Sequence, residues 1–309
     1  MNLFVTLPDL DPEALKVLQE LFDCVDCATE RTSEENQLID IASKYDAIII
    51  GAKEKMSEKV YNSSTKLKII GTLSSGTDHI CDNFKNDDEK VILRCATSNV
   101  ISVAEHTLMM MLVHTKRFRQ GEHLLKEGKG RTDLRPLPLD LYQKTVGIIG
   151  LGPIGTRVTQ LASKIGMKTL VHTRNPSNHQ ELLEEGAIFT SLNDLLEKSD
   201  ITTIHLPLTE ATKSFLNKDN IPLLKENAML INTSRADIVD NSFLMKHIES
   251  EKDIFYAIDV EWGEITDDLM GKLIDNDSVY MSPHVAGLSR DAMFRMDTDL
   301  AAEFKVLLQ

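Results

Sequence analysis

The sequence predicts an α/β protein built on open parallel sheets. Short β-branched runs, such as residues 47–50 and 146–149, are typical of strands that are buried on both faces. Amphipathic stretches with helical periodicity separate these runs along most of the chain. A strand–helix–strand unit with a glycine-rich turn occupies residues 144–174. Strands that alternate with helices in this way pair in parallel.

The composition fits a globular protein and excludes several classes of partner. The chain has 309 residues, enough for two domains, and 42% of them are hydrophobic, which suffices for ordinary cores. The formal net charge of −14 argues against nucleic acid or an anionic membrane as a partner. No apolar run reaches membrane-spanning length, and the N-terminus lacks the pattern of a signal peptide, so we expect a cytoplasmic protein.

The cysteines predict no metal site. Cys24 and Cys27 form a lone C-x-x-C, with no second pair and no nearby histidine to complete a zinc site. Reduced thiols are the expected state in a cytosolic protein, and a redox pair is the alternative.

Residues 1–98 alternate strands and helices. Strands are predicted at 3–7, 47–50 and 67–72, and helices at 13–22 and 34–43. The last strand runs into LSSGTDHI, residues 73–80. Ligands of open α/β sheets bind beyond the carboxyl ends of the strands, so the backbone N–H groups of Ser75 and Gly76 are candidates to bind a carboxylate. A plain strand-to-helix turn explains this segment equally well.

Residues 99–117 form the longest helical pattern. The pattern is apolar nearly all round in its middle, which predicts a buried helix joining two domains. His106 and His114 on this helix are expected to be core or surface histidines rather than ligands. Residues 120–142 are rich in glycine and proline and predict a loop-rich arm, which either wraps a partner subunit or lies on the surface.

The glycine-rich unit predicts a dinucleotide site. Gly150, Gly152 and Gly155 follow a buried strand with G-x-G-x-x-G spacing and open a helix. The first glycine allows a tight turn, the second lets the backbone approach a pyrophosphate, and the third lets the helix pack closely on the strand. The N-terminus of the helix offers unpaired N–H groups to the phosphates.

The end of the next strand, 168–172, indicates which dinucleotide binds. An acidic residue there normally binds the ribose hydroxyl, but the chain has Thr173 followed by Arg174. A neutral residue beside a guanidinium suits a 2′-phosphate, which predicts NADP, with NAD as the alternative. Arg174 as a solvated surface charge is the competing interpretation.

The βα alternation continues after residue 174, with helices at 182–185 and 193–197 and strands at 201–205, 228–232 and 255–260. The predicted strand ends carry polar residues that should converge on one crevice. These residues are Thr233, Ser234 and Arg235, then Asp259 and Glu264, then Ser282 and His284.

Three of these residues match the needs of hydride transfer to a carbonyl. His284 is a candidate proton donor, and a neighbouring Glu264 would raise its pKa. Arg235 offers a planar fork for a carboxylate. Taken singly, His284 is better explained as a loop histidine, Glu264 as a solvated acid and Arg235 as part of a surface ion pair.

The chain resembles the D-2-hydroxyacid dehydrogenase family over most of its length. The resemblance lies in LSSGTDHI (73–80), NVISVAEHTLMMML (99–112), TVGIIGLGPIG (145–155), HLPLTEAT (205–212), INTSRADIVD (231–240), AIDVEWGEI (257–265) and SPHVAG (282–287). It implies two Rossmann-like, doubly wound parallel-sheet domains, with the cofactor domain inserted into a discontinuous substrate domain. The substrate domain would be flavodoxin-like and span 1–98 plus 287–309, and the dinucleotide-binding domain would span 99–286. Homodimers that close a hinge over the substrate are also implied.

The resemblance assigns roles to individual residues. The catalytic arginine, glutamate and histidine fall on Arg235, Glu264 and His284, and recognition of the nicotinamide carboxamide falls on Asp259. The substrate is held by the backbone of Ser75 and Gly76, together with Arg235 and His284. Further cofactor contacts fall on Pro153, Ile154, Thr233, Ser234 and Gly287, besides Arg235 and His284.

The chain departs from the family pattern at several points. Ile265 replaces the usual proline after the glutamate, Ala236 replaces the glycine after the arginine, and no tryptophan lies near residue 130. The chain ends soon after its last helix, which disfavours a long, serine-regulated phosphoglycerate dehydrogenase.

The sequence therefore predicts an NADP-preferring reductase that converts small 2-keto acids to D-2-hydroxy acids. The Thr173–Arg174 pair resembles the NADPH-linked glyoxylate/hydroxypyruvate reductases, so glyoxylate and hydroxypyruvate are the expected substrates. The alternatives are an NAD-linked short phosphoglycerate or D-lactate-type dehydrogenase, and a non-catalytic nucleotide-sensing binding protein.

Overall fold

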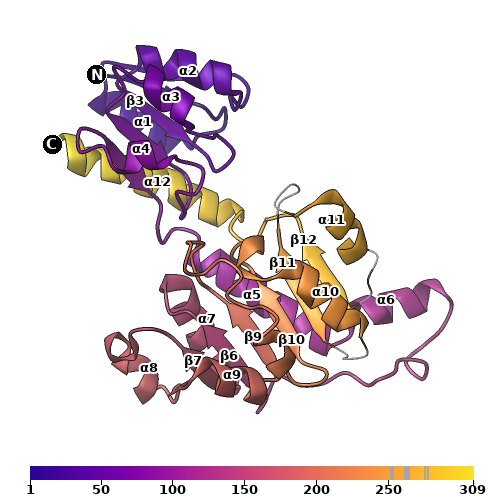
Figure 1. Cartoon of the computed structure of the whole chain (residues 1–309). Helices are drawn as coiled ribbons and strands as arrows, with labels where there is room; N and C mark the ends of the chain where they lie inside the picture. Colours follow the sequence, from indigo (N-terminus) through magenta and orange to yellow (C-terminus); the bar gives the residue numbers. More distant parts are fainter. Residues whose placement is uncertain (251–253, 261–264, 275, 277) are drawn as a thin grey trace. The chain divides into compact units, whose positions relative to one another are not determined.

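The computed structural model describes residues 1–309 except 251–253, 261–264, 275 and 277 (Figure 1). The chain folds into two compact units. Unit 1 comprises Met1–Asn99 and Leu288–Gln309, and unit 2 comprises Val100–Gly287. Each unit has one sheet, and every strand pair in both sheets is parallel. The predicted fold class is confirmed, because one α/β unit is inserted into the sequence of the other.

Unit 1 has a five-stranded sheet in the order β2-β1-β3-β4-β5. Helices from both ends of the chain cover it, and Figure 1 shows α12 beside α1. The strands are β1 (Asn2–Val5), β2 (Cys24–Cys27), β3 (Ala47–Ile50), β4 (Ile69–Thr72) and β5 (Val91–Arg94). The helices are α1 (Pro12–Leu21), α2 (Glu35–Lys44), α3 (Glu58–Ser63), α4 (Asp82–Lys85) and α12 (Arg290–Leu308).

The four residues of strand β3 are all apolar because both of its faces are buried. Ala47 and Ile49 pack in a cluster with α1 and α12, whereas Ile48 and Ile50 pack in a second cluster with α2, α3 and α4. Alternate side chains of a strand point to opposite faces, and both faces of this sheet are covered. The edge strands β2 and β5 have mostly exposed or half-buried residues, so they lack the buried run by which β3 was predicted.

Unit 2 has a seven-stranded sheet in the order β12-β11-β10-β9-β6-β7-β8. Its strands are β6 (Thr145–Ile149), β7 (Lys168–His172), β8 (Ile188–Phe189), β9 (Ile201–Ile204), β10 (Met229–Asn232), β11 (Phe255–Asp259) and β12 (Val279–Ser282). Its helices are α5 (Val100–Thr115), α6 (Phe118–Lys126), α7 (Pro153–Lys164), α8 (Gln180–Glu184), α9 (Leu192–Lys198), α10 (Asn241–Glu249) and α11 (Asp267–Ile274).

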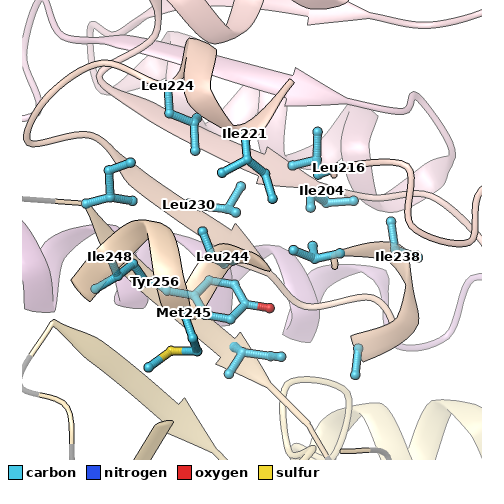
Figure 2. Close-up of a cluster of buried hydrophobic side chains, with 14 of the residues drawn as sticks. Ile204, Leu216, Ile221, Leu224, Leu230, Ile238, Leu244, Met245, Ile248 and Tyr256 are labelled. Carbon is cyan, nitrogen blue, oxygen red and sulfur yellow. The ribbon is translucent and has the colours of Figure 1, made fainter. Parts of the chain in front are cut away.

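The core of unit 2 also has two layers. Figure 2 shows the layer in which Leu230 of β10 and Tyr256 of β11 lie among side chains of α10, such as Leu244 and Met245. On the opposite face, Ile231 of β10 packs with residues of α5 and α7. The sheet is therefore held rigidly, and its strand ends provide fixed positions for functional side chains.

The prediction that residues 99–117 form a buried helix is wrong for one face. Helix α5 buries Val103, Met110 and Met111, but Met109 and Leu112 are 46% and 40% exposed. The sequence is apolar all round, yet only one side of the helix packs against this chain. The other side is an uncovered apolar face.

The predicted loop at 120–142 is also wrong in its first part, because α6 extends to Lys126. Gly121 lies inside this helix, where it costs about 1 kcal/mol relative to alanine. Contacts to the neighbouring sheet support the helix: Arg119 Nη1 donates to the carbonyl of Val279 (3.1 Å), and Gln120 Nε2 donates to the hydroxyl of Tyr280 (3.1 Å).

Candidate active site

The glycine turn after β6 fits a dinucleotide. Gly150 has φ +94°, and a Cβ there would lie 2.6 Å from the carbonyl oxygen of His205. A Cβ on Gly155 would lie 2.0 Å from the carbonyl oxygen of Gly150. A Cβ on Gly152 would meet nothing within 4 Å, and Gly152 is exposed. The first and third glycines are thus required by the fold, while the second leaves open space for a ligand.

Helix α7 begins at this turn, with Gly152 as its N-cap and Pro153 as its first residue. Proline has no N–H group, so the next two N–H groups, of Ile154 and Gly155, are those left open by the helix geometry. Val158 and Ala162 fix the helix in the core. The turn and the helix N-terminus together form a site suited to phosphate.

The end of β7 carries no acidic residue. Thr173 is half-buried and Arg174 is exposed. Among the residues that the structure describes, Arg174 makes no hydrogen bond or ion pair. The nearest following acid is Glu181, which lies 3.7 Å from the ring of His179. This arrangement leaves the guanidinium accessible to an anion.

The turn after β10 presents Arg235. Asn232 braces the turn on both sides: its Oδ1 accepts from the Ser234 N–H (3.0 Å), and its Nδ2 donates to the Arg235 carbonyl (2.8 Å). Ser234 Oγ donates to the carbonyl of Ile204 at the end of β9 (2.8 Å). The hydroxyl oxygen of Thr233 lies 3.4 Å from the hydroxyl oxygen of Thr107 on α5. Arg235 is half-buried at the end of a braced turn, where a planar cation can face a ligand.

The turn after β12 presents His284 in an unusual backbone conformation, with φ +52°. Asp259, at the end of β11, is 3% exposed and holds this turn. Its Oδ1 accepts from the Ser282 hydroxyl (2.5 Å) and the Val285 N–H (2.9 Å), and its Oδ2 accepts from the Ala286 N–H (2.9 Å).

Helix α5 supports the same turn from the side. Ser102 Oγ donates to the carbonyl of Ala286 (2.7 Å), and His106 Nε2 lies 3.0 Å from Ser282 Oγ. Burial lowers the pKa of His106, and the nearby Asp259 carboxylate opposes this shift in part. The sequence alone predicts a core or surface histidine at position 106. The available signal was that Ser102 and His106 are four residues apart, on one face of a helix.

Unit 1 has its own polar loop, at the end of β4. Thr72 Oγ1 lies 2.8 Å from Ser74 Oγ and 3.0 Å from His79 Nε2. Ser74 Oγ donates to the carbonyl of Gly76 (2.6 Å). The N–H groups of Ser75 and Gly76 donate no hydrogen bond to any described residue. The loop therefore presents backbone donors of the kind that bind an anion.

Glu264 lies outside the described residues. Gly287 is half-buried and is the last residue of unit 2.

The C-x-x-C pair does not favour redox chemistry. Cys24 and Cys27 are three residues apart in strand β2, so their side chains point to opposite faces. Desolvation and the Asp26 carboxylate raise the pKa of both thiols, which disfavours the reactive thiolate.

The family model described as "D-isomer specific 2-hydroxyacid dehydrogenase, NAD binding domain" matches residues 108–286. The chain belongs to this family. The match lies within unit 2, which therefore corresponds to the NAD-binding domain of the family.

Relatives in the family have several activities. Glyoxylate reductase from Aeropyrum pernix is 30% identical over 304 residues, which cover 96% of this chain and 89% of the relative. D-3-phosphoglycerate dehydrogenase from Synechocystis sp. is 30% identical over 275 residues, which cover 89% of this chain and 49% of the relative. This chain thus spans about half the length of that relative.

The crystal structure of a D-lactate dehydrogenase has the same fold as nearly the whole of this chain. The structure of D-lactate dehydrogenase from Aquifex aeolicus, complexed with NAD and lactic acid, has a TM-score of 0.86 at 28% identity and covers 99% of this chain and 95% of its own.

No group of His, Cys, Asp and Glu side chains within the described part of this protein is arranged to hold a metal ion. None of its described helices has the length and apolar character needed to cross a membrane.

Proposed function

We propose that this dehydrogenase reduces a small 2-keto acid to a D-2-hydroxy acid with NADPH, and that glyoxylate and hydroxypyruvate are its substrates. The proposal depends chiefly on one observation. The glycine turn, Arg235 and His284 follow β6, β10 and β12 of one parallel sheet, so all of them lie at its carboxyl edge.

Each residue has a role in this reaction. When bound, the nicotinamide supplies the hydride that reaches the keto carbon. The His284 imidazole gives a proton to the keto oxygen, and the Arg235 guanidinium holds the substrate carboxylate. The N–H groups of Ser75 and Gly76 in unit 1, the substrate domain, bind a carboxylate oxygen. Glu264 is proposed to favour the protonated form of His284.

The cofactor is proposed to be held along the same edge. Gly150, Gly152, Pro153, Ile154 and Gly155 form the phosphate site, and Arg174 with Thr173 contacts the adenosine ribose. Further contacts are assigned to Thr233, Ser234, Arg235, Asp259, His284 and Gly287. NADP is preferred because Arg174 is an exposed cation and no acid stands at the end of β7.

Initial rates on one purified sample test both parts of the proposal. NADPH and NADH are each measured with glyoxylate, hydroxypyruvate, pyruvate and 3-phosphohydroxypyruvate. Faster oxidation of NADPH with glyoxylate or hydroxypyruvate supports the proposal. Preference for pyruvate would favour a D-lactate-type enzyme, and consumption of neither cofactor would contradict reductase activity.

The variant Arg174→Ala isolates the cofactor preference. Loss of one charged contact to a phosphate costs about 1.5 kcal/mol, or roughly tenfold in binding. The KM for NADPH should rise by this factor while the KM for NADH stays unchanged. An equal rise for both cofactors would show that Arg174 does not contact the 2′-phosphate.

We also propose that the protein forms a homodimer through the uncovered face of α5 and the segment that follows it. This surface contains Met109, Leu112, Phe118 (66% exposed) and Leu125 (73% exposed). A hollow of about 490 Å³ lies between α6 and the following loop. A soluble monomer rarely exposes such an extended apolar surface, and a second copy would cover it. Light scattering should give the dimer mass for the wild type and the monomer mass for Leu112→Glu with Phe118→Glu.

A further inference from the structure

A chain of polar contacts runs from the middle of α5 to the turn that carries His284. His106 Nε2 lies 3.0 Å from Ser282 Oγ, and Ser282 Oγ lies 2.5 Å from Asp259 Oδ1. These groups come from α5, β12 and β11, and all of them belong to unit 2. None of the roles assigned above uses His106.

Counting protons fixes the direction of these hydrogen bonds. A serine hydroxyl has one proton, and a carboxylate can only accept. Ser282 therefore donates its proton to Asp259, so its oxygen must accept from His106. It follows that His106 carries a proton on Nε2. Because burial lowers its pKa, the neutral Nε2–H tautomer is the form that satisfies the contact at neutral pH.

The contacts end on the backbone that follows the strained residue, His284. Asp259 accepts from the N–H groups of Val285 and Ala286, which directly follow His284. A residue other than glycine rarely adopts the left-handed region and persists there only where its surroundings enforce it. The Asp259 carboxylate supplies this restraint, and the Ser282 hydroxyl fixes the position of the carboxylate.

We propose that His106 is a positioning residue for His284. By donating from Nε2 to Ser282, it orients the serine hydroxyl toward Asp259, and Asp259 in turn holds the His284 turn in place. His106 does not touch the reacting atoms. This inference rests on the proposed function for its kinetic test, but not for its structural test.

The kinetic test uses a double-mutant cycle. His106→Leu removes the donor, His106→Gln keeps an amide donor at a similar position, and Ser282→Ala removes the intermediate hydroxyl. Because one hydrogen bond is worth about 1 kcal/mol, kcat should fall roughly three- to tenfold in His106→Leu and in Ser282→Ala. The KM for the cofactor should change less than kcat, because the phosphate site is not altered.

The cycle separates a positioning role from general damage to the fold. His106→Gln should recover most of the lost kcat, and the double variant His106→Leu with Ser282→Ala should be no slower than the slower single variant. His114→Leu is the matched control, because it removes another histidine from α5 and should leave kcat unchanged. Equal losses in His106→Gln and His106→Leu, or multiplied losses in the double variant, would overturn the proposal.

A second measurement reads the tautomer without any activity. Long-range ¹H–¹⁵N correlation spectra of histidine-labelled protein distinguish Nε2–H from Nδ1–H, and the His106→Gln spectrum identifies the signal of residue 106. The proposal requires the Nε2–H form at neutral pH, and an Nδ1–H form would overturn it. If the wild type reduces no 2-keto acid, the proposed function fails while this result still decides the role of His106.

Discussion

Each unit has a polar loop in which a histidine contacts a hydroxyl, but the two loops differ in the group that accepts the last hydrogen bond. Each follows a strand of a parallel sheet, and each has a histidine Nε2 at 3.0 Å from a hydroxyl: His79 with Thr72 in unit 1, and His106 with Ser282 in unit 2. In unit 1 the contacts end on the Gly76 carbonyl, whereas in unit 2 they end on the Asp259 carboxylate.

The group that accepts the last hydrogen bond decides whether the backbone N–H groups of each loop are available to a ligand. In unit 1 the acceptor is a carbonyl, and no described residue accepts from the N–H groups of Ser75 and Gly76, so this loop can bind an anion. The carboxylate of Asp259 occupies the N–H groups of Val285 and Ala286, so the unit 2 turn is fixed and presents a side chain. One loop is built to bind through its backbone, and the other to hold an imidazole.

The largest effect is expected when the imidazole of His284 is removed. His284→Ala should lower kcat by roughly a hundredfold or more, because a general acid contributes at least that much. Cofactor affinity, measured from the enhancement of NADPH fluorescence, should stay nearly intact. A variant that retained more than about a tenth of the wild-type kcat would remove His284 from the proton transfer.

Changing the acceptor in unit 2 should have the next largest effect. Asp259→Asn would place an amide N–H group where a carboxylate oxygen now accepts hydrogen bonds. Facing donors in a buried site, this group would lower the free energy of unfolding by about 1–3 kcal/mol. We expect a lower midpoint of urea unfolding and a fall in kcat. If kcat stayed at the wild-type value, the Asp259 carboxylate would not be holding His284.

The corresponding change in unit 1 should be milder and of a different kind. Ser74→Ala removes the donor to the Gly76 carbonyl and loosens the loop that is proposed to bind the substrate carboxylate. The KM for the 2-keto acid should rise about three- to tenfold, as expected for one hydrogen bond, with kcat little changed. A fall in kcat at constant KM would contradict the division of roles between the two loops.

The smallest effect concerns a second buried aspartate, on α12. Asp297 is 5% exposed, as buried as Asp259, but its Oδ2 accepts only from the Asp11 N–H (2.9 Å) and its Oδ1 has no partner among the described residues. Burial raises the pKa of Asp297 to about 6. The folded state therefore binds this proton more tightly than the unfolded state, and its contribution to stability is lost as the pH rises through about 6.

Asp297→Asn should accordingly stabilise the protein at pH 8, by about 1 kcal/mol after allowance for partial solvent screening. The urea midpoint of the wild type should fall between pH 5 and pH 8, and the variant should lose that part of the slope. If the variant kept the same dependence of the urea midpoint on pH, the pKa of Asp297 would not be raised in the folded state.

The sequence predicted the elements whose pattern is local. The all-apolar run of β3 and the glycine spacing after β6 have few alternative structures, and both were placed correctly. The edge strands β2 and β5 were missed, because one side of each is solvated. Helix α6 was missed because Gly121 weakens its helical pattern, and contacts from Arg119 and Gln120 to β12 compensate for that weakness.

The sequence alone determined the family resemblance, the parallel α/β architecture and the order of polar residues at the strand ends, because each depends on residue types at short spacing. Only the tertiary structure decided which face of α5 is uncovered and where His106 points. Ser282 lies 176 residues after His106, and the direction of their hydrogen bond depends on Asp259 of a third element. A hydroxyl can donate or accept, so its direction is set by the partners that folding brings to it.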